Sequence, residues 1–135
     1  MTVGSVYLAA RFGRQSEMRQ RRLDLLEVGV AVTSHWLDED PSGANEFDLT
    51  EEERQSIARL DLGDVARADA LVLFTEERTP DRNSAGIGRH IETGYALARG
   101  KPVFVVGPTE TVFHSHPRVR VFSTWPTLID ELRTP

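Results

Sequence analysis

Five apolar runs alternate with longer amphipathic stretches along the chain, and this alternation is the main structural signal in the sequence. The apolar runs cover residues 3–10, 30–33, 70–75, 103–106 and 119–122. Continuous apolar runs of this length are typical of strands buried on both faces of a parallel sheet, because strands with one exposed face alternate polar and apolar residues instead. The pattern therefore predicts about five parallel strands.

The stretches between these runs have helical spacing and recognisable ends. The expected helices follow Gly13, begin at Thr50, cover 89–99 and begin again at 124–126. The helix that begins at Thr50 opens with a capping box, and acidic residues follow at its N-terminus, the positive end of the helix dipole. Its apolar pattern leaves open a break near Asp61. Alternating strands and helices predict an α/β fold, a single-domain, doubly wound sheet with helices on both sides.

Length and composition suit one soluble globular domain. The chain has 135 residues, of which 39% are hydrophobic and 27% are charged, and a chain of this size has room for one core. No apolar run approaches the ~18 residues of a membrane span and no signal-peptide pattern is present, so we expect a cytoplasmic protein. The absence of cysteine excludes thiolate catalysis and cysteine-ligated zinc, and a net charge of -5 argues against binding to a nucleic-acid polymer.

The richest candidate chemistry lies in the segment SAGIGRHIETG at residues 84–94. Ligands of such sheets bind beyond the carboxyl ends of the strands, and this segment follows the third apolar run. Gly86 and Gly88 would let the backbone approach a ligand closely. Glu92 is expected within the first turn of the next helix, where the positive helix end favours the ionised carboxylate that a nucleophile or base needs. A Glu in a first helical turn is also a common surface feature, so the spacing leaves both interpretations open.

A second acid is expected near the same end of the sheet. Asp61 precedes Asp69 by eight residues. A helix of that length is ~12 Å long, and the strand that follows Asp69 runs back in the opposite direction for ~16 Å. Asp61 should therefore lie near the carboxyl end of that strand. Asp69 is then a structural or capping residue at the lower end, and Asp64 is expected on a solvated helix face. For Asp61 a surface position is the alternative.

Tyr7, two arginines and two histidines complete the candidates. The Tyr7 hydroxyl would reach the same crevice, or Tyr7 is a core residue with one hydrogen bond. Arg11 and Arg14 follow the first run, where guanidinium groups would bind phosphate or sugar oxygens. His114 and His116 would point the same way in an extended segment, but zinc needs a third ligand that the spacing does not supply. The sequence therefore predicts no metal site and no cofactor.

Four segments follow one another in an order known from one enzyme family. They are VYLAARFGRQ at 6–15, TSHW at 33–36, DLGDVARADALVLF at 61–74 and SAGIGRHIETGYALARGKPVFVV at 84–106. Together they resemble the nucleoside 2-deoxyribosyltransferase family, including its hydrolase branch, the 2'-deoxynucleoside 5'-phosphate N-hydrolases. The resemblance implies a flavodoxin-like or Rossmann-like strand order and a homodimer.

The resemblance also assigns roles to individual residues. It implies that Glu92 attacks the anomeric carbon, that Tyr7 contacts Glu92 and that Asp61 is the second acid of the site. It further implies that Ser84 touches a substrate phosphate and that a neighbouring subunit completes the site, a role for which Ser115 is the candidate. The chain departs from the family pattern between its second glycine and Glu92, where it has three residues instead of one.

The reaction implied by the resemblance is cleavage of the N-glycosidic bond of a nucleoside or deoxynucleoside, or of the corresponding 5'-monophosphate. It would proceed with retention through a covalent glycosyl-Glu92 intermediate, with transfer of the sugar to water or to another base. Asp61 would protonate the leaving base. The partner is then a small molecule, with no nucleic-acid polymer and no membrane. The alternatives are a non-catalytic nucleotide-binding or sensor module of the same fold and a structural partner protein.

Overall fold

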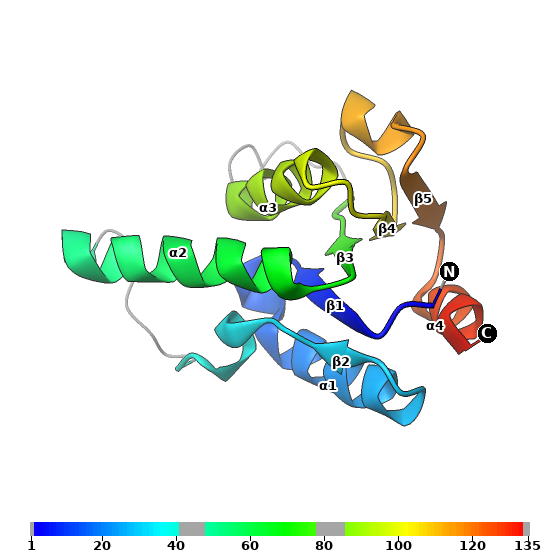
Figure 1. Cartoon of the computed structure of the whole chain (residues 1–135), viewed down its shortest axis with the longest axis horizontal. Helices are drawn as coiled ribbons and strands as arrows, with labels where there is room; N and C mark the ends of the chain where they lie inside the picture. Colours follow the sequence, from blue (N-terminus) through cyan, green and yellow to red (C-terminus); the bar gives the residue numbers. More distant parts are fainter. Residues whose placement is uncertain (1, 41–47, 78–85, 134–135) are drawn as a thin grey trace.

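The computed structural model describes residues 2–40, 48–77 and 86–133, and its centre is one five-stranded sheet. The strands are β1 (Ser5–Ala9), β2 (Ala31–Val32), β3 (Ala70–Phe74), β4 (Val103–Val106) and β5 (Val119–Phe122). All neighbouring pairs are parallel, in the order β2-β1-β3-β4-β5. This is the flavodoxin-like order of a doubly wound sheet. The predicted α/β class and number of strands are therefore confirmed (Figure 1).

The centre of the sheet is buried on both faces, which explains the continuous apolar runs. Every residue of β3 is buried, and so is every residue of β4. Tyr7 of β1 pairs with Leu71 of β3, which in turn pairs with Val103 of β4. Edge strand β5 is largely exposed, and edge strand β2 has only two residues. The core therefore gathers around β1, β3 and β4.

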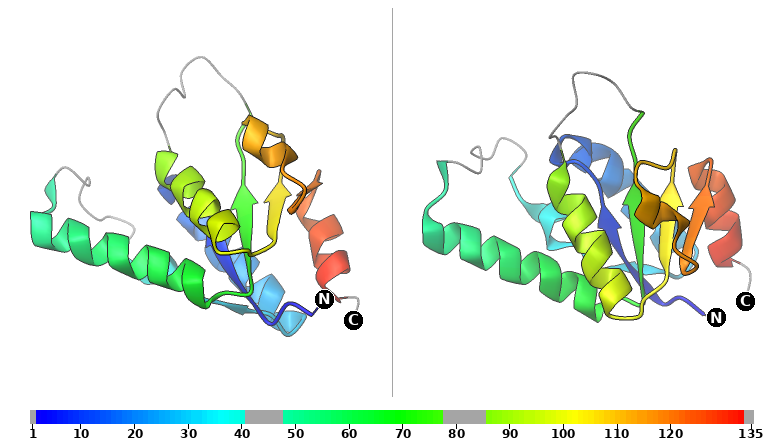
Figure 2. Two further views of the ribbon diagram at one scale, coloured as in Figure 1. Left: turned by 45° about the horizontal axis from the view of Figure 1, so that its top comes forward. Right: turned by 90° about the horizontal axis from the view of Figure 1, so that it is seen from above.

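Helices cover both faces of the sheet. They are α1 (Gln15–Glu27), α2 (Glu51–Arg67), α3 (Ile87–Ala98) and α4 (Trp125–Arg133), with short 3-10 helices η1 (Phe12–Arg14), η2 (His35–Asp38) and η4 (Val112–Ser115). Helices α1 and α4 lie on one face, and α2 and α3 lie side by side on the other (Figures 1 and 2). The indole N–H of Trp125 donates a hydrogen bond of 2.9 Å to Asp24, which ties α4 to α1.

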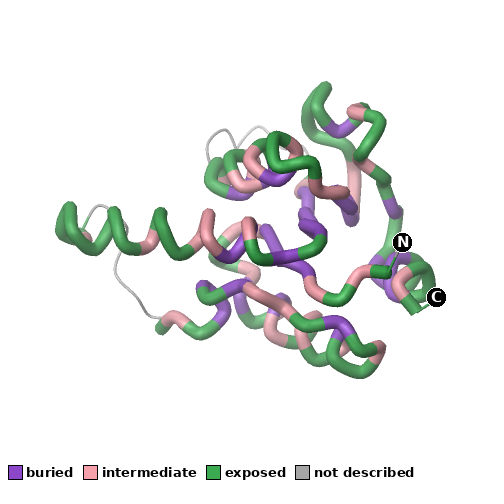
Figure 3. Tube along the Cα trace, in the orientation of Figure 1, coloured by how far each residue is buried: buried purple, intermediate pink, exposed green. Residues whose placement is uncertain are grey.

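Helix α2 begins as the sequence predicts. The Thr50 hydroxyl accepts a hydrogen bond from the Glu53 backbone N–H at 3.0 Å, and the Glu53 carboxylate accepts one from the Thr50 N–H at 2.9 Å. The helix is continuous through Asp61, so the break left open at that residue is absent, because the backbone ladder runs unbroken to Arg67. Its N-terminal half extends past the sheet and is exposed (Figure 3).

Two polar side chains hold the chain at the amino end of the central strands. The Asp69 carboxylate accepts backbone hydrogen bonds from Gly4 at 2.8 Å and Ser5 at 3.1 Å, which confirms its expected structural role. The Lys101 ammonium donates to the carbonyls of Ala66 and Ala68. These contacts fix the ends of β1 and β3 relative to each other. No helix in the described ranges is both long and apolar enough to cross a membrane.

Candidate active site

A short polar contact beside the sheet joins Tyr7 of β1 to Glu92 of α3. The Tyr7 hydroxyl donates a hydrogen bond of 2.5 Å to Glu92 Oε2, across 85 residues of sequence. Tyr7 is fully buried and Glu92 is partly buried. The two residues predicted from strand and helix positions thus meet, and the Glu92 carboxylate points toward the sheet instead of into bulk solvent.

Asp61 of α2 lies beside this pair. Its negative charge raises the pKa values of both Tyr7 and Glu92. Burial raises the pKa of Asp61 itself to about 7, reinforced by the charges of Glu39 and Asp64 and opposed by His35. Within the described ranges, Asp61 Oδ1 is buried and has no hydrogen-bond partner. A carboxyl group in such a place favours the protonated form and is suited to donate a proton.

Glu92 differs from the sequence expectation in its position on the helix and in its charge. Helix α3 begins at Ile87 with Gly86 as its N-cap, so Glu92 is the sixth helical residue and lies beyond the first turn. The free N–H groups of the helix end therefore do not reach it. Burial raises its pKa to about 8, although the hydrogen bond from Tyr7 works in the opposite direction. The prediction that the helix end keeps Glu92 ionised is wrong.

Burial and the neighbouring charges of Glu92 and Asp61 raise the pKa of Tyr7 far above its usual value. The phenol therefore remains protonated at any physiological pH and acts only as a donor toward Glu92. A hydrogen-bond donor at this position stabilises the Glu92 carboxylate relative to its acid form. The site thus contains one acid with a donor, Glu92, and one acid whose buried oxygen lacks a donor, Asp61.

Asp64, one turn along α2 from Asp61, is fully buried, so its predicted position on a solvated face is wrong. Its carboxylate accepts from the backbone N–H of His35 at 2.8 Å, from His35 Nδ1 at 2.7 Å and from the Arg67 guanidinium. The contact fixes η2 against α2 and holds the His35 ring near Asp61. Because Asp61, Asp64 and Val65 have helical spacing i, i+3, i+4, they share one face. That spacing is the signal that could have identified Asp64 as an inward residue.

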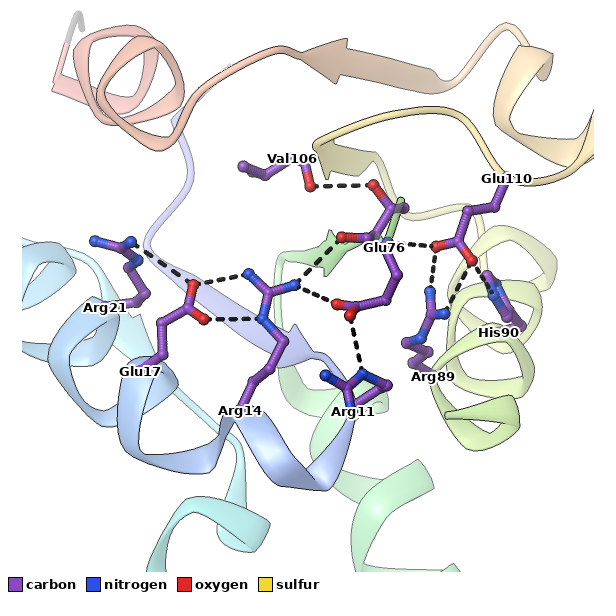
Figure 4. Close-up of polar contacts among 10 residues, drawn as sticks. Arg11, Arg14, Glu17, Arg21, Glu76, Arg89, His90, Val106 and Glu110 are labelled. Carbon is purple, nitrogen blue, oxygen red and sulfur yellow. Dashed lines mark hydrogen bonds and ion pairs between the residues drawn. The ribbon is translucent and has the colours of Figure 1, made fainter. Parts of the chain in front are cut away.

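Arginines and carboxylates form a network at the carboxyl end of the sheet (Figure 4). Arg11 and Arg14 both pair with Glu76, at 2.9 and 2.7 Å. On the other side of the network, the buried Arg89 makes a bidentate contact with Glu110, at 2.5 and 2.9 Å. The two halves are joined by the Glu76 backbone N–H, which donates to Glu110 at 3.0 Å. The predicted binding arginines therefore lie at the expected edge, where carboxylates already contact them.

Both glycines of the predicted loop lie at the start of α3. Gly86 has φ +78, and a Cβ built on it would lie 2.6 Å from Arg11 Cγ and 2.8 Å from Arg89 Nε. Glycine is therefore required there by the backbone and by two neighbouring side chains. Gly88 is an exposed residue of the first turn of α3. Ser84 lies outside the described residues.

The region of the two C-terminal histidines is helical instead of extended. His114 is buried in η4 and its Nδ1 accepts from the Glu110 backbone N–H, whereas His116 Nδ1 accepts from the backbone of Arg118. The two rings thus serve separate local turns. Ser115 is exposed at the end of η4. In the ranges that the structure describes, no group of three or more His, Asp or Glu residues is arranged to hold a metal ion.

The two raised pKa values predict how stability depends on pH. The pKa values of Asp61 and Glu92 rise from 3.8 and 4.5 to about 7 and about 8 on folding. At pH values between the unfolded and folded pKa values, the folded chain binds more protons than the unfolded chain. The two acids therefore contribute their full stabilisation of the fold at low pH, and this contribution is lost as pH rises toward 8. We expect the double variant Asp61→Asn/Glu92→Gln to gain several degrees in melting temperature relative to wild type as pH rises from 5 to 8.

Circular dichroism melts of wild type and double variant at matched pH values measure this difference. Taking the difference cancels contributions from other titrating groups, such as His90 and His114. A constant offset between the two melting curves across this pH range would show that neither acid has a raised pKa in the folded chain.

Comparison with known proteins places this site in a family. A family model described as nucleoside 2-deoxyribosyltransferase matches residues 6–123. The 2-deoxyribosyltransferase of Bacillus psychrosaccharolyticus is 21% identical and superposes with a TM-score of 0.72, over 93% of this chain and 90% of that one. The CMP N-glycosidase of Clostridium botulinum is 19% identical, with a TM-score of 0.59 over 95% and 97% of the two chains.

No curated protein sequence matches the chain significantly. The two structural similarities establish the fold, and the family model covers well over half of the sequence. It spans β1, both acids and the whole arginine network. The chain therefore belongs to the nucleoside 2-deoxyribosyltransferase family.

Proposed function

We propose that the protein cleaves the N-glycosidic bond of a deoxynucleoside or a deoxynucleoside 5'-monophosphate. The observation that carries this proposal is the hydrogen bond between buried Tyr7 and Glu92, with Asp61 beside it. Two carboxyl groups with different surroundings are what a retaining glycosidase needs, because one must attack while the other donates a proton. Family membership and the names of the two similar enzymes, a deoxyribosyltransferase and a CMP N-glycosidase, support the same class of reaction.

In the first half of the reaction, the single proton of the pair is on Asp61, and an oxygen of the ionised Glu92 carboxylate forms a bond to C1' of the sugar as the bond from C1' to the base nitrogen breaks. The electron pair of the broken bond stays with the base, which takes the proton of Asp61. The sugar is then esterified to Glu92. The positive charge that develops on the sugar lowers the pKa of the adjacent Glu92 carboxyl, so the carboxylate is favoured as the transition state is approached.

In the second half, water or another base attacks C1' from the side that the first base left. The Asp61 carboxylate takes the proton of the attacking group, and the bond between C1' and Glu92 breaks. Two displacements at the same carbon restore the original anomeric configuration. Tyr7 keeps its proton throughout and orients Glu92 through the hydrogen bond that it donates.

The remaining candidate residues enter the proposal as binding groups. Arg11, Arg14 and the N-terminus of α3 near Gly86 and Gly88 would contact the sugar and its 5' substituent. Ser84 would contribute a hydroxyl to a substrate phosphate. We place exposed Ser115 in the site of a neighbouring subunit in a homodimer, where it would complete the substrate contacts.

The test is base release, followed by capture of the intermediate. Each deoxynucleoside and its 5'-monophosphate is incubated with the protein, with and without a second base, and free base is separated by chromatography. Acid quenching and intact-mass measurement are expected to show a chain heavier by one deoxyribosyl or deoxyribosyl phosphate group, mapped by peptide fragmentation to Glu92.

Base exchange without net hydrolysis would identify a transferase, and net release would identify a hydrolase. The opposite anomer as first product would contradict the covalent intermediate. Thermal stabilisation by nucleotides without any base release would identify the binding module instead of an enzyme.

A further inference from the structure

In the part of the chain that the structure describes, Arg11, Arg14 and Arg89 lie at the carboxyl end of the sheet, and each is paired with a carboxylate (Figure 4). Glu76 accepts from Arg11 Nε at 2.9 Å and from Arg14 Nη1 at 2.7 Å. Glu110 accepts from both terminal nitrogens of Arg89, at 2.5 and 2.9 Å. These are charge-assisted contacts with good geometry, including one bidentate pair, which is the arrangement that a guanidinium would otherwise offer to a phosphate.

This network lies next to the proposed reaction centre. Arg89 precedes Glu92 by three residues on α3, a rise of about 4.5 Å along the helix. Arg11 follows β1, which carries Tyr7. Side-chain atoms of Arg11 and Arg89 converge on Gly86 at the start of α3, where a Cβ would lie within 2.8 Å of both. In the proposed function, a sugar whose anomeric carbon faces Glu92 would place its 5' substituent near these arginines.

The carboxylates of the network balance its arginines. Glu17 makes a bidentate contact with Arg14 at 2.8 Å and also pairs with Arg21, which contacts Asp24. Among the described residues, four guanidinium groups therefore face four carboxylates, those of Glu17, Asp24, Glu76 and Glu110. Burial alone would raise the pKa of Glu76, but its bonds to Arg11 and Arg14 outweigh burial and lower it. The pKa of Glu110 is likewise lowered, because its bond to Arg89 outweighs burial. Glu17, Glu76 and Glu110 are thus ionised at neutral pH, and within the described residues the network has no net charge.

A phosphate group near this network meets two costs. It carries a charge of about -2 at neutral pH, and to bind the terminal nitrogens of Arg14 or Arg89 it must first displace a carboxylate, whereas Arg11 contacts Glu76 through Nε. The displaced carboxylate then lies close to the phosphate, and the side chain of Glu76 is only 12% exposed, so little water separates the two charges. A neutral 5'-hydroxyl meets neither cost and can donate a hydrogen bond to an ionised carboxylate.

We propose that the preferred substrate is the uncharged deoxynucleoside, because the carboxylates of Glu76 and Glu110 lie among the arginines that a 5'-phosphate would need. This inference rests on the proposed cleavage of the glycosidic bond. It assigns Glu76 as the residue that selects against the phosphate, through its contacts with Arg11 and Arg14.

The experiment compares kcat/KM for a deoxynucleoside and for the 5'-monophosphate of the same nucleoside. In wild type we expect the deoxynucleoside to be favoured by at least about tenfold. Glu76→Gln keeps the shape of the side chain and removes its charge, and we expect it to shift the ratio toward the monophosphate by about fivefold or more. Glu131→Gln, which removes the same charge from an exposed pair with Arg120, is expected to leave the ratio unchanged.

The outcomes separate this inference from the proposed function. Base release that is faster from the monophosphate than from the nucleoside would overturn the inference while supporting glycosidic cleavage. An unchanged ratio in folded Glu76→Gln would overturn the role of Glu76. Absence of base release from both substrates would overturn the proposed function itself. Because the wild-type comparison needs no variant, it remains decisive even where Glu76→Gln does not fold.

Discussion

Replacing Glu92 by glutamine is expected to reduce kcat for base release by at least about 10⁴-fold, because the amide cannot form the bond to C1'. The amide keeps nearly the same shape and can still accept a hydrogen bond from Tyr7. Substrate binding is therefore expected to change little, so the loss should appear in kcat and leave the dissociation constant almost unaltered. Single-turnover kinetics and calorimetric titration measure the two quantities separately.

Glu131→Gln is the matched control, since Glu131 is an exposed residue of α4 paired with Arg120. It is expected to turn over like wild type. A small external nucleophile adds a second arm: azide should restore cleavage in Glu92→Ala by occupying the space of the lost carboxylate. Glu92→Gln with a tenth or more of wild-type turnover would exclude Glu92 as the nucleophile.

Replacing Asp61 by asparagine is expected to lower kcat/KM for natural nucleosides by about 10²- to 10⁴-fold, the range found when a general acid is removed. The loss follows from the need to protonate the leaving base. A 2-deoxyriboside whose leaving group is a nitrophenolate departs without a proton, so Asp61→Asn should cleave it at close to the wild-type rate. Glu92→Gln should be inactive on both substrates, which distinguishes the acid from the nucleophile.

The same variants also test the pH dependence. Asp61 and Glu92 are active when the pair carries one proton. A plot of kcat/KM against pH for a natural nucleoside should therefore be bell-shaped, with its limbs set by the pKa values of about 7 and about 8 of the two acids. On the nitrophenolate substrate the alkaline limb should disappear, because loss of the Asp61 proton no longer matters. Equal losses on both substrates in Asp61→Asn would instead indicate a positioning role for Asp61. Exposed Asp38, replaced by asparagine, is the control.

The fold could be predicted closely from the sequence because burial on both faces leaves a continuous apolar signal. The predicted runs at 103–106 and 119–122 coincide with β4 and β5. The predicted start of α3, residue 89, was less accurate. Gly86 caps the helix in a left-handed conformation, and Ile87 is already helical. That shift of two residues moves Glu92 from the first turn into the second.

The positions of the candidate acids were easier to predict than their electrostatics. The family resemblance implies a contact between Tyr7 and Glu92, and the two residues do meet. The direction of the Glu92 pKa shift was not predictable in this way, because desolvation depends on how α2 and α3 pack over β1. The same packing buries Asp64, whose charge alone suggested a solvated face. The pairing of Arg11 and Arg14 with Glu76 is likewise a property of the assembled sheet.

The contact between Tyr7 and Glu92 has a consequence for how the protein acquires activity. It joins the first strand of the chain to its third long helix, and β1 must be inserted between β2 and β3 before the phenol can reach the carboxylate. Closing so long a loop has an entropic cost that only the finished sheet offsets. No fragment ending before residue 92 can hold the pair. During refolding, recovered turnover therefore reports the moment at which the middle of the sheet is complete.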